Sequence, residues 1–98
     1  MKTIVENNIL TIFLQDKIHS NNVDQVGEEV FKAINAYGGD DIIFDAEKLD
    51  YISSAGLRLI LKVQKQNKKP IKMINISESI YEIFEIAGFT DLLELKKA

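Results

Sequence analysis

Two adjacent serines, Ser53 and Ser54, stand immediately before an apolar segment whose spacing is that of a helix. The first turn of a helix presents backbone N–H groups that lack intrahelical partners, together with the positive end of the helix dipole. A phosphate attached to a hydroxyl at this point would be held by groups that the helix already supplies. The arrangement therefore predicts a surface that phosphorylation can switch, and it is not typical of a catalytic pocket.

Capping of the helix is the simpler interpretation of this pair, since the loss of such a cap costs about 1 kcal/mol. Three features favour a further role. One cap needs only one serine, so the second hydroxyl is left over. Gly56 in the first turn costs roughly 0.5–1 kcal/mol relative to alanine, which suggests that another backbone or a kinase approaches closely. Arg58 is the only arginine in the chain and lies four residues beyond Ser54, within reach of a group on that side chain.

The cations Arg58, Lys62 and Lys65 continue along one face of the same segment, and Lys69 follows it. A solvated polar stripe is the simpler interpretation, but cations beside a hydroxyl pair also predict a docking surface for an acidic partner. Phosphorylation would add about −1.5 to −2 charges. The helix start and Arg58 would accept that charge, whereas a partner would have to desolvate or repel it. Folding would survive while binding failed.

Composition excludes several other chemistries. The 98 residues make one domain, 1–98, without cysteine and with His19 as the only histidine. Disulfides, thiolate catalysis and a multi-histidine metal site are therefore excluded. The net charge of −3 argues against nucleic-acid binding, and no apolar run approaches the length of a membrane span or of a signal peptide. We expect a cytoplasmic protein without metal or cofactor, and without nucleic-acid or membrane partners.

Periodicity and turn residues predict the elements of the domain. Asn7-Asn8 supplies the turn of a first hairpin. The first two predicted strands, Thr3–Val5 and Ile9–Leu14, are rich in β-branched residues, and the others are Asp41–Asp45, Ile71–Ile76 and, as a final short strand, Leu92–Leu95. The predicted helices are bounded by capping residues: one from Asn22, with Gln25 completing a capping box, to Gly38; one over Ala55–Gln66; and one from Ser77 to Gly88.

The order β-β-α-β-α-β-α-(β) predicts an α/β fold with a mixed four- to five-stranded sheet. Right-handed βαβ units would place the helices mainly on one face. The alternation in Ile71–Ile76 is broken by Lys72 and Asn75, which places this strand toward a sheet margin. Asp45 is expected to end a central strand and to cap the following turn. The order of the strands across the sheet is left open.

With these features in place, the chain resembles the STAS domain family and, within it, the single-domain anti-sigma factor antagonists of bacteria. The resemblance covers nearly the whole chain. Its most specific parts are the block IIFDAEKLDYISSAGL, in which an apolar strand leads to a hydroxyl pair before Gly-Leu, and the tail SESIYEIFEIAGFTDLL.

The resemblance implies a partner-switching mechanism. The unmodified domain would bind an anti-sigma factor of the serine kinase type and so release a sigma factor. Phosphorylation would break the complex, and a phosphatase would restore it. The family's phosphorylated serine corresponds best to Ser54, with Ser53 as the alternative because it stands where many members have Asp. Ala55 replaces a second hydroxyl, and His19 stands where many members have an upstream Asp. The free domain is expected to be a monomer.

The resulting candidate site is a partner-binding surface at the start of the second helix, flanked by the loop Lys17–Asn22 that precedes the first helix. Its predicted members are Ser53, Ser54, Ala55, Gly56, Leu57, Arg58, Lys62, His19 and Ser20. Two alternatives stay open. The same fold could serve as an unphosphorylated scaffold subunit of a larger regulatory or lipid-transport complex. An enzyme would need His19 as its base, and a loop residue without an orienting acid does not favour that role.

Overall fold

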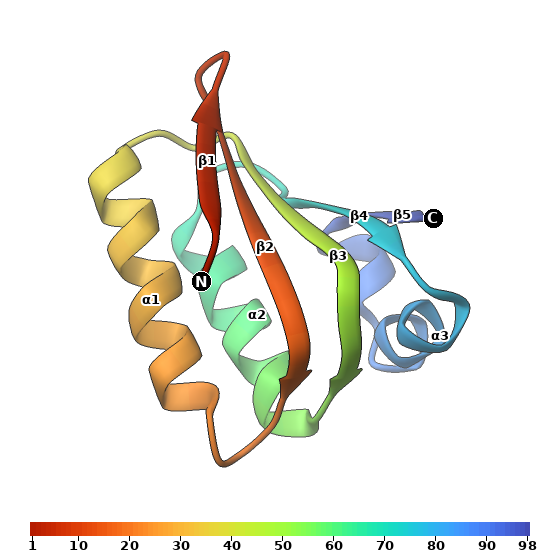
Figure 1. Cartoon of the computed structure of the whole chain (residues 1–98). Coiled ribbons are helices and arrows are strands. Elements are labelled where there is room, and N and C mark those ends of the chain that lie inside the picture. The colour runs from red at the N-terminus through yellow and green to blue at the C-terminus, as the bar shows by residue number, and fades with distance from the viewer.

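Strands and helices alternate in the computed structural model, which describes all residues 1–98 (Figure 1). The strands are β1 (Thr3–Glu6), β2 (Ile9–Ile18), β3 (Ile42–Ile52), β4 (Lys72–Ile76) and β5 (Glu94–Lys97). The helices are α1 (Val23–Tyr37), α2 (Ser54–Gln66) and α3 (Glu78–Ile86), followed by the short 3-10 helix η1 (Phe89–Asp91). No helix combines the length and the apolar character that a membrane span requires. The predicted α/β class and element order are confirmed.

The five strands form one mixed sheet in the order β1-β2-β3-β4-β5. Strand β1 is antiparallel to β2, and the remaining neighbours are parallel. Each βαβ unit adds its second strand on the same side of the first, and right-handed crossovers then place the helices on a common face. Figure 1 shows α1 and α2 behind the sheet and α3 beyond the end of β4. The carboxyl ends of β2 and β3 therefore lie together beside the starts of α1 and α2.

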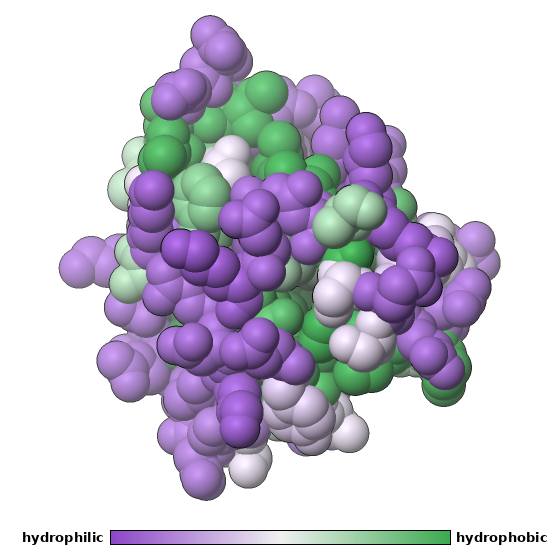
Figure 2. Space-filling view, turned by 45° about the vertical axis from the view of Figure 1, so that its right-hand side comes forward, coloured by the Kyte–Doolittle hydropathy of each residue, from purple (hydrophilic) through white to green (hydrophobic).

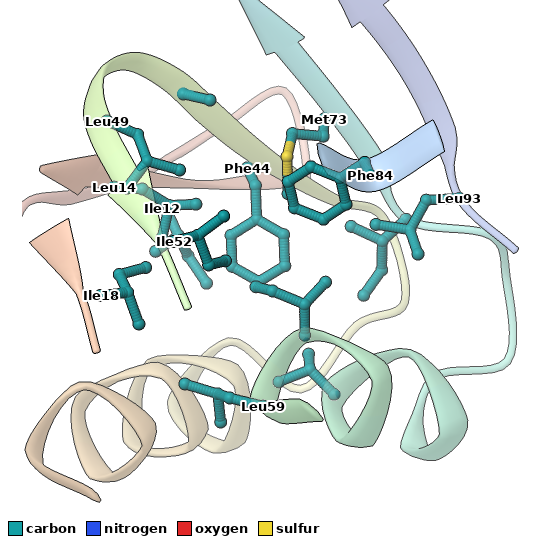
Figure 3. Packing of buried hydrophobic residues seen from close by; sticks show 14 of the residues in the cluster. Ile12, Leu14, Ile18, Phe44, Leu49, Ile52, Leu59, Met73, Phe84 and Leu93 are labelled. Carbon is teal, nitrogen blue, oxygen red and sulfur yellow. The ribbon is translucent and has the colours of Figure 1, made fainter. Parts of the chain in front are cut away.

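The core is a single cluster of 20 buried hydrophobic residues, and no polar or charged residue is buried with them. Buried residues alternate along the first part of β2 and of β3, whereas Leu49 and Ile52 follow Ala46 at intervals of three. Phe44 lies at the centre of the cluster between Ile52 and Phe84 (Figure 3). The rings of Phe84 and Phe89 pack edge to face, with their centroids 5.3 Å apart. Hydrophobic patches among hydrophilic side chains remain on the surface in Figure 2.

Several local predictions are confirmed. Asn7 and Asn8 have φ angles of 51° and 66°, the left-handed geometry of a tight hairpin turn. Gly38 ends α1 with φ 75°, and its N–H donates to the carbonyl of Ile34. The Ser77 hydroxyl accepts from the N–H of Ile80 at 3.3 Å. These signals were readable because each depends on a few consecutive residues.

The predicted cap of α1 is wrong. Asn22 makes no side-chain capping bond to the helix, so the capping box with Gln25 does not form. Its Oδ1 instead accepts from the N–H of His19 at 2.9 Å, and its Nδ2 donates to the carbonyl of Lys17 at 2.7 Å. Asn22 therefore stabilises the tight loop that leads from β2 into the helix.

Two strands are longer than predicted. Strand β3 continues from Ile42 to Ile52, where the sequence suggested a loop after Asp45, and β2 continues to Ile18. The added part of β2 pairs with the added part of β3, and the last pair is Ile18 with Ile52. Asp45 consequently lies within β3 and not at its end, although its side chain makes the expected local bond to the backbone two residues on. Its carboxylate accepts from the N–H of Glu47 at 3.0 Å and from Nδ2 of Asn75 at 3.2 and 3.3 Å.

Strand β4 lies toward a margin of the sheet, as expected, because only the short edge strand β5 pairs outside it. Asn75 has φ 57°, and the register between β4 and β5 shifts between Met73 and Ile76. This bulge turns Ile76 into the core with Met73, so the regular alternation expected for this strand does not hold. Strand β5 begins at Glu94, after η1, in place of the predicted Leu92–Leu95.

Candidate functional site

The two serines at the start of α2 have different roles in the structure. Ser53 is the N-cap residue, with extended backbone, and its Oγ accepts from the N–H of Gly56 at 3.3 Å. Ser54 is the first residue of the helix, is exposed, and its hydroxyl bonds to no other group of the chain. The expectation that one hydroxyl caps and the other is left over therefore describes this site.

The first turn of α2 also leaves backbone donors open. The N–H groups of Ser54 and Ala55 donate to no other group of the chain, whereas Leu57 N–H is bonded to the carbonyl of Ser53. Arg58 is exposed four residues beyond Ser54, and residues at this spacing lie on the same helix face. An anion on the Ser54 hydroxyl would thus meet two free N–H donors nearby, the helix dipole and a guanidinium on the same face.

The loop after β2 is tied to this turn. Ser53 N–H donates to the carbonyl of Ile18 at 2.9 Å, which holds the start of α2 against the end of β2. His19 follows directly and is partly buried, and its Nδ1 accepts from the N–H of Asn21 at 3.1 Å. The two segments of the predicted partner-binding surface therefore lie side by side. His19 and Ser20 line a hollow of about 490 Å³ beside it, together with Lys17, Asn21 and Tyr51.

The close approach of another backbone, one of the two reasons expected for Gly56, occurs within the domain itself. Gly56 is buried, and a Cβ at this position would lie 2.6 Å from Cγ1 of Ile52, 3.0 Å from Cγ2 of Ile18 and 3.2 Å from the Ile18 carbonyl oxygen. The close approach that requires glycine is thus made within the domain. Leu57 is only partly exposed and packs against the core. Gly56 and Leu57 therefore position the helix start, while Ser54 and Arg58 are the exposed members of this turn.

A groove of about 700 Å³ runs between α1 and α2. Three of the predicted site residues, Ala55, Arg58 and Lys62, line it from α2. None of the predicted site residues belongs to the α1 side, which is formed by Val23, Asp24, Gly27, Glu28 and Phe31. The sequence signal that could have pointed to this side of the groove was Gly27, a glycine in the interior of a predicted helix, between Asp24 and Glu28.

The cationic stripe on α2 ends earlier than its sequence pattern suggested. Arg58, Lys62 and Lys65 are exposed, and Nζ of Lys62 lies 5.6 Å from the ring centre of Phe31. Lys69 instead pairs with Asp41 at 2.9 Å, at the other end of the helix. The hydrogen bond that Lys69 donates to this carboxylate raises the pKa of Lys69 above its ordinary value. Lys69 therefore does not belong to the surface around Ser54.

Comparison with known proteins places the chain in a family. The STAS domain family matches residues 1–98, and the chain belongs to it. The chain is 33% identical over 87 residues to BtrV of Bordetella bronchiseptica, described as a candidate anti-sigma factor antagonist, covering 86% of this chain and 74% of that protein. It is 34% identical over 73 residues to the anti-sigma-B factor antagonist of Staphylococcus aureus, covering 71% of this chain and 68% of that one.

Solved structures share the fold. A candidate anti-sigma factor antagonist of Thermotoga maritima superposes with a TM-score of 0.86 at 12% identity, over 99% of this chain and 86% of that one. The anti-sigma factor antagonist SpoIIAA, in its unphosphorylated form, gives a TM-score of 0.72 at 19% identity, over 99% and 87% of the two chains. At these identities the likeness concerns the fold, and it agrees with the strand and helix order described above.

Proposed function

We propose that the protein is an anti-sigma factor antagonist whose binding is switched off by phosphorylation of Ser54. The unmodified domain binds an anti-sigma factor of the serine kinase type through the start of α2 and the loop after β2, and so releases a sigma factor. The observation that carries this proposal is the free, exposed Ser54 hydroxyl beside the capping Ser53. The names of the relatives described above support the same class of function.

The free domain is built to accept a phosphate on Ser54. The cap uses Ser53 and the carbonyl of Ile18, so modification of Ser54 breaks none of the bonds that hold the helix start. A negative group near a helix N-terminus is stabilised by typically 0.3–1 kcal/mol, and Arg58 adds an exposed cation on the same face. Folding therefore survives the modification.

The complex would not survive it. A partner packed on this turn excludes water from Ser54, and a phosphate brings about −1.5 to −2 charges that have to be desolvated. Partner groups arranged for a neutral hydroxyl supply no counter-charge. That the solved SpoIIAA structure is specified as the unphosphorylated form is consistent with a phosphorylation switch in this family. Ser53 is the alternative acceptor, but its hydroxyl is engaged in the cap and the residue is only partly exposed.

The direct test measures the affinity of the anti-sigma factor from the same genome for three variants by isothermal titration calorimetry. Ser54→Ala should bind as the parent does, because it removes only the acceptor hydroxyl. Ser54→Asp should bind at least about tenfold more weakly, equivalent to about 1.4 kcal/mol, while unfolding at the parent's temperature. Ser79→Asp is the matched control, since it places the same charge on an exposed serine in the first turn of α3.

Equal affinity for Ser54→Ala and Ser54→Asp would remove Ser54 from the mechanism. The kinase activity of the partner is tested separately by incubation with ATP. We expect intact mass to show one added phosphate on the parent and none on Ser54→Ala. Phosphate that remains on Ser54→Ala and maps to Ser53 would assign the switch to the neighbouring serine. A protein that carries no phosphate in its native cells and co-purifies with a stable assembly would favour the scaffold alternative.

A further inference from the structure

The groove between α1 and α2 has two walls of opposite charge. Asp24 and Glu28 lie on the α1 side, and Arg58 and Lys62 lie on the α2 side. The chain has three ion pairs, and none of them joins the two walls. All four of these side chains are therefore free of ion pairs, and the Lys62 ammonium lies over the ring of Phe31, 5.6 Å from its centre.

The floor between these walls is apolar. Val23 and Phe31 contribute to it from α1, and Ala55 and Leu59 contribute from α2. Gly27 keeps the floor low, because a Cβ at this position would lie 3.2 Å from Cδ1 of Leu59. A low apolar floor between two charged walls suits an amphipathic helix, which places apolar residues at helical spacing along the centre of a groove.

We propose that this groove receives one amphipathic helix of the anti-sigma factor, with basic residues toward Asp24 and Glu28 and acidic residues toward Arg58 and Lys62. The inference rests on the proposed function and extends its contact surface to α1. A helix fits because its two flanks carry different side chains while its central face stays apolar. A nucleic acid or an anionic membrane would be repelled by the acidic wall.

The groove also connects this contact to the switch. Ala55 lines the groove and directly follows Ser54, so the phosphorylated side chain stands at the end where α2 begins. A helix seated along the groove reaches this end beside the phosphate. Modification of Ser54 therefore acts on a helix that is held along the whole groove, and not only on contacts at the first turn.

Charge reversal of the α1 wall tests the proposal. The variant Asp24→Lys/Glu28→Lys should bind the purified anti-sigma factor at least tenfold more weakly than the parent does, because its new lysines would face the basic flank of the helix. The matched control is Glu82→Lys/Glu85→Lys on α3, which changes the net charge by the same amount at two exposed positions. The control should bind as the parent does. Glu28→Lys alone keeps Asp24 in the first turn of α1 and should show a smaller loss in the same direction.

A label placed in the groove provides a second readout. The chain has no cysteine, so Glu28→Cys carries a single thiol for an environment-sensitive dye. Its emission should shift to shorter wavelength when the anti-sigma factor binds, whereas the dye on Glu82→Cys should not respond. Hydrogen exchange of the anti-sigma factor should slow within one helical segment on binding.

The outcomes separate this inference from the proposed function. If Asp24→Lys/Glu28→Lys and Glu28→Lys bind as tightly as the parent while Ser54→Asp binds weakly, the groove assignment is overturned and the switch stays in place. Protection confined to a loop of the anti-sigma factor would overturn the helical occupant. Absence of binding by the parent chain would overturn the proposed function and this inference with it.

Discussion

Replacement of Gly56 by alanine should destabilise the domain, although alanine is the better residue for a helix. Alanine favours a helix interior over glycine by about 1 kcal/mol. The added Cβ, however, would lie 2.6 Å from Cγ1 of Ile52 and 3.2 Å from the carbonyl oxygen of Ile18. Both neighbours are held in place, since Ile18 and Ile52 pair with each other at the ends of β2 and β3.

Overpacking of this kind costs typically about 1–3 kcal/mol, and the contacts here favour the upper end. The net loss for Gly56→Ala is then about 2 kcal/mol. For a domain of this length, each 1 kcal/mol lowers the melting temperature by about 4–8 °C, so we expect a fall of about 8–16 °C. The urea midpoint should fall by about 1 M for a slope near 2 kcal/mol/M.

Gly27→Ala is the matched control, because it also replaces a buried glycine in a helix. Its only close neighbour is a terminal methyl of Leu59 at 3.2 Å, and this flexible side chain can turn away. We expect its free energy of unfolding to stay within about 0.5 kcal/mol of the parent's or to rise, owing to the better helix residue. A Gly56→Ala domain as stable as the parent, or an equal loss in both variants, would refute the reasoning.

Two further predictions concern the ends of α2. Ser53→Ala should lower the free energy of unfolding by about 1 kcal/mol because it removes the cap. Ser54→Ala should change the free energy of unfolding by less than about 0.5 kcal/mol. Equal losses of stability for the two variants in thermal melts would contradict the assigned roles. At the other end, Asp41→Asn should bring the pKa of Lys69 down toward its ordinary value, as followed by NMR of the side chain. Because the pKa of Lys69 is raised in the folded state, the ion pair stabilises the fold at a pH below the pKa of an unfolded lysine, and this stabilisation is lost as the pH rises through the folded pKa. The difference in the free energy of unfolding between Asp41→Asn and the parent should therefore narrow as the pH of the urea titration is raised through this range.

If the start of α2 is both the binding surface and the switch, its rigidity matters for both. The N–H of Ser53 donates to Ile18 at 2.9 Å, and Gly56 lets the helix sit close enough for this bond. A phosphate on Ser54 adds charge beside these contacts without replacing any of them. The proposed phosphorylation would therefore change the binding state of the domain while its fold stays the same.

Local sequence features predicted much of this structure. The asparagine turn, the glycine cap of α1 and the serine cap of α3 each depend on neighbours within one turn of the chain. The hydroxyl pair before Ala-Gly-Leu likewise identified the start of α2, because serine is a common N-cap residue. Since one cap needs only one serine, the pair also predicted a second hydroxyl that is left over. Such features are readable without knowledge of the fold.

Contacts between distant segments decided the rest. Strand β3 continues to Ile52 because β2 pairs with it. The sequence by itself determined the alternation of strands and helices and the presence of a free hydroxyl at a helix start. Only the tertiary structure placed α1 beside α2 and so formed the two-sided groove. The physical reason is that a cap or turn is stabilised within a few residues, whereas a groove depends on which elements the packing of the core brings together.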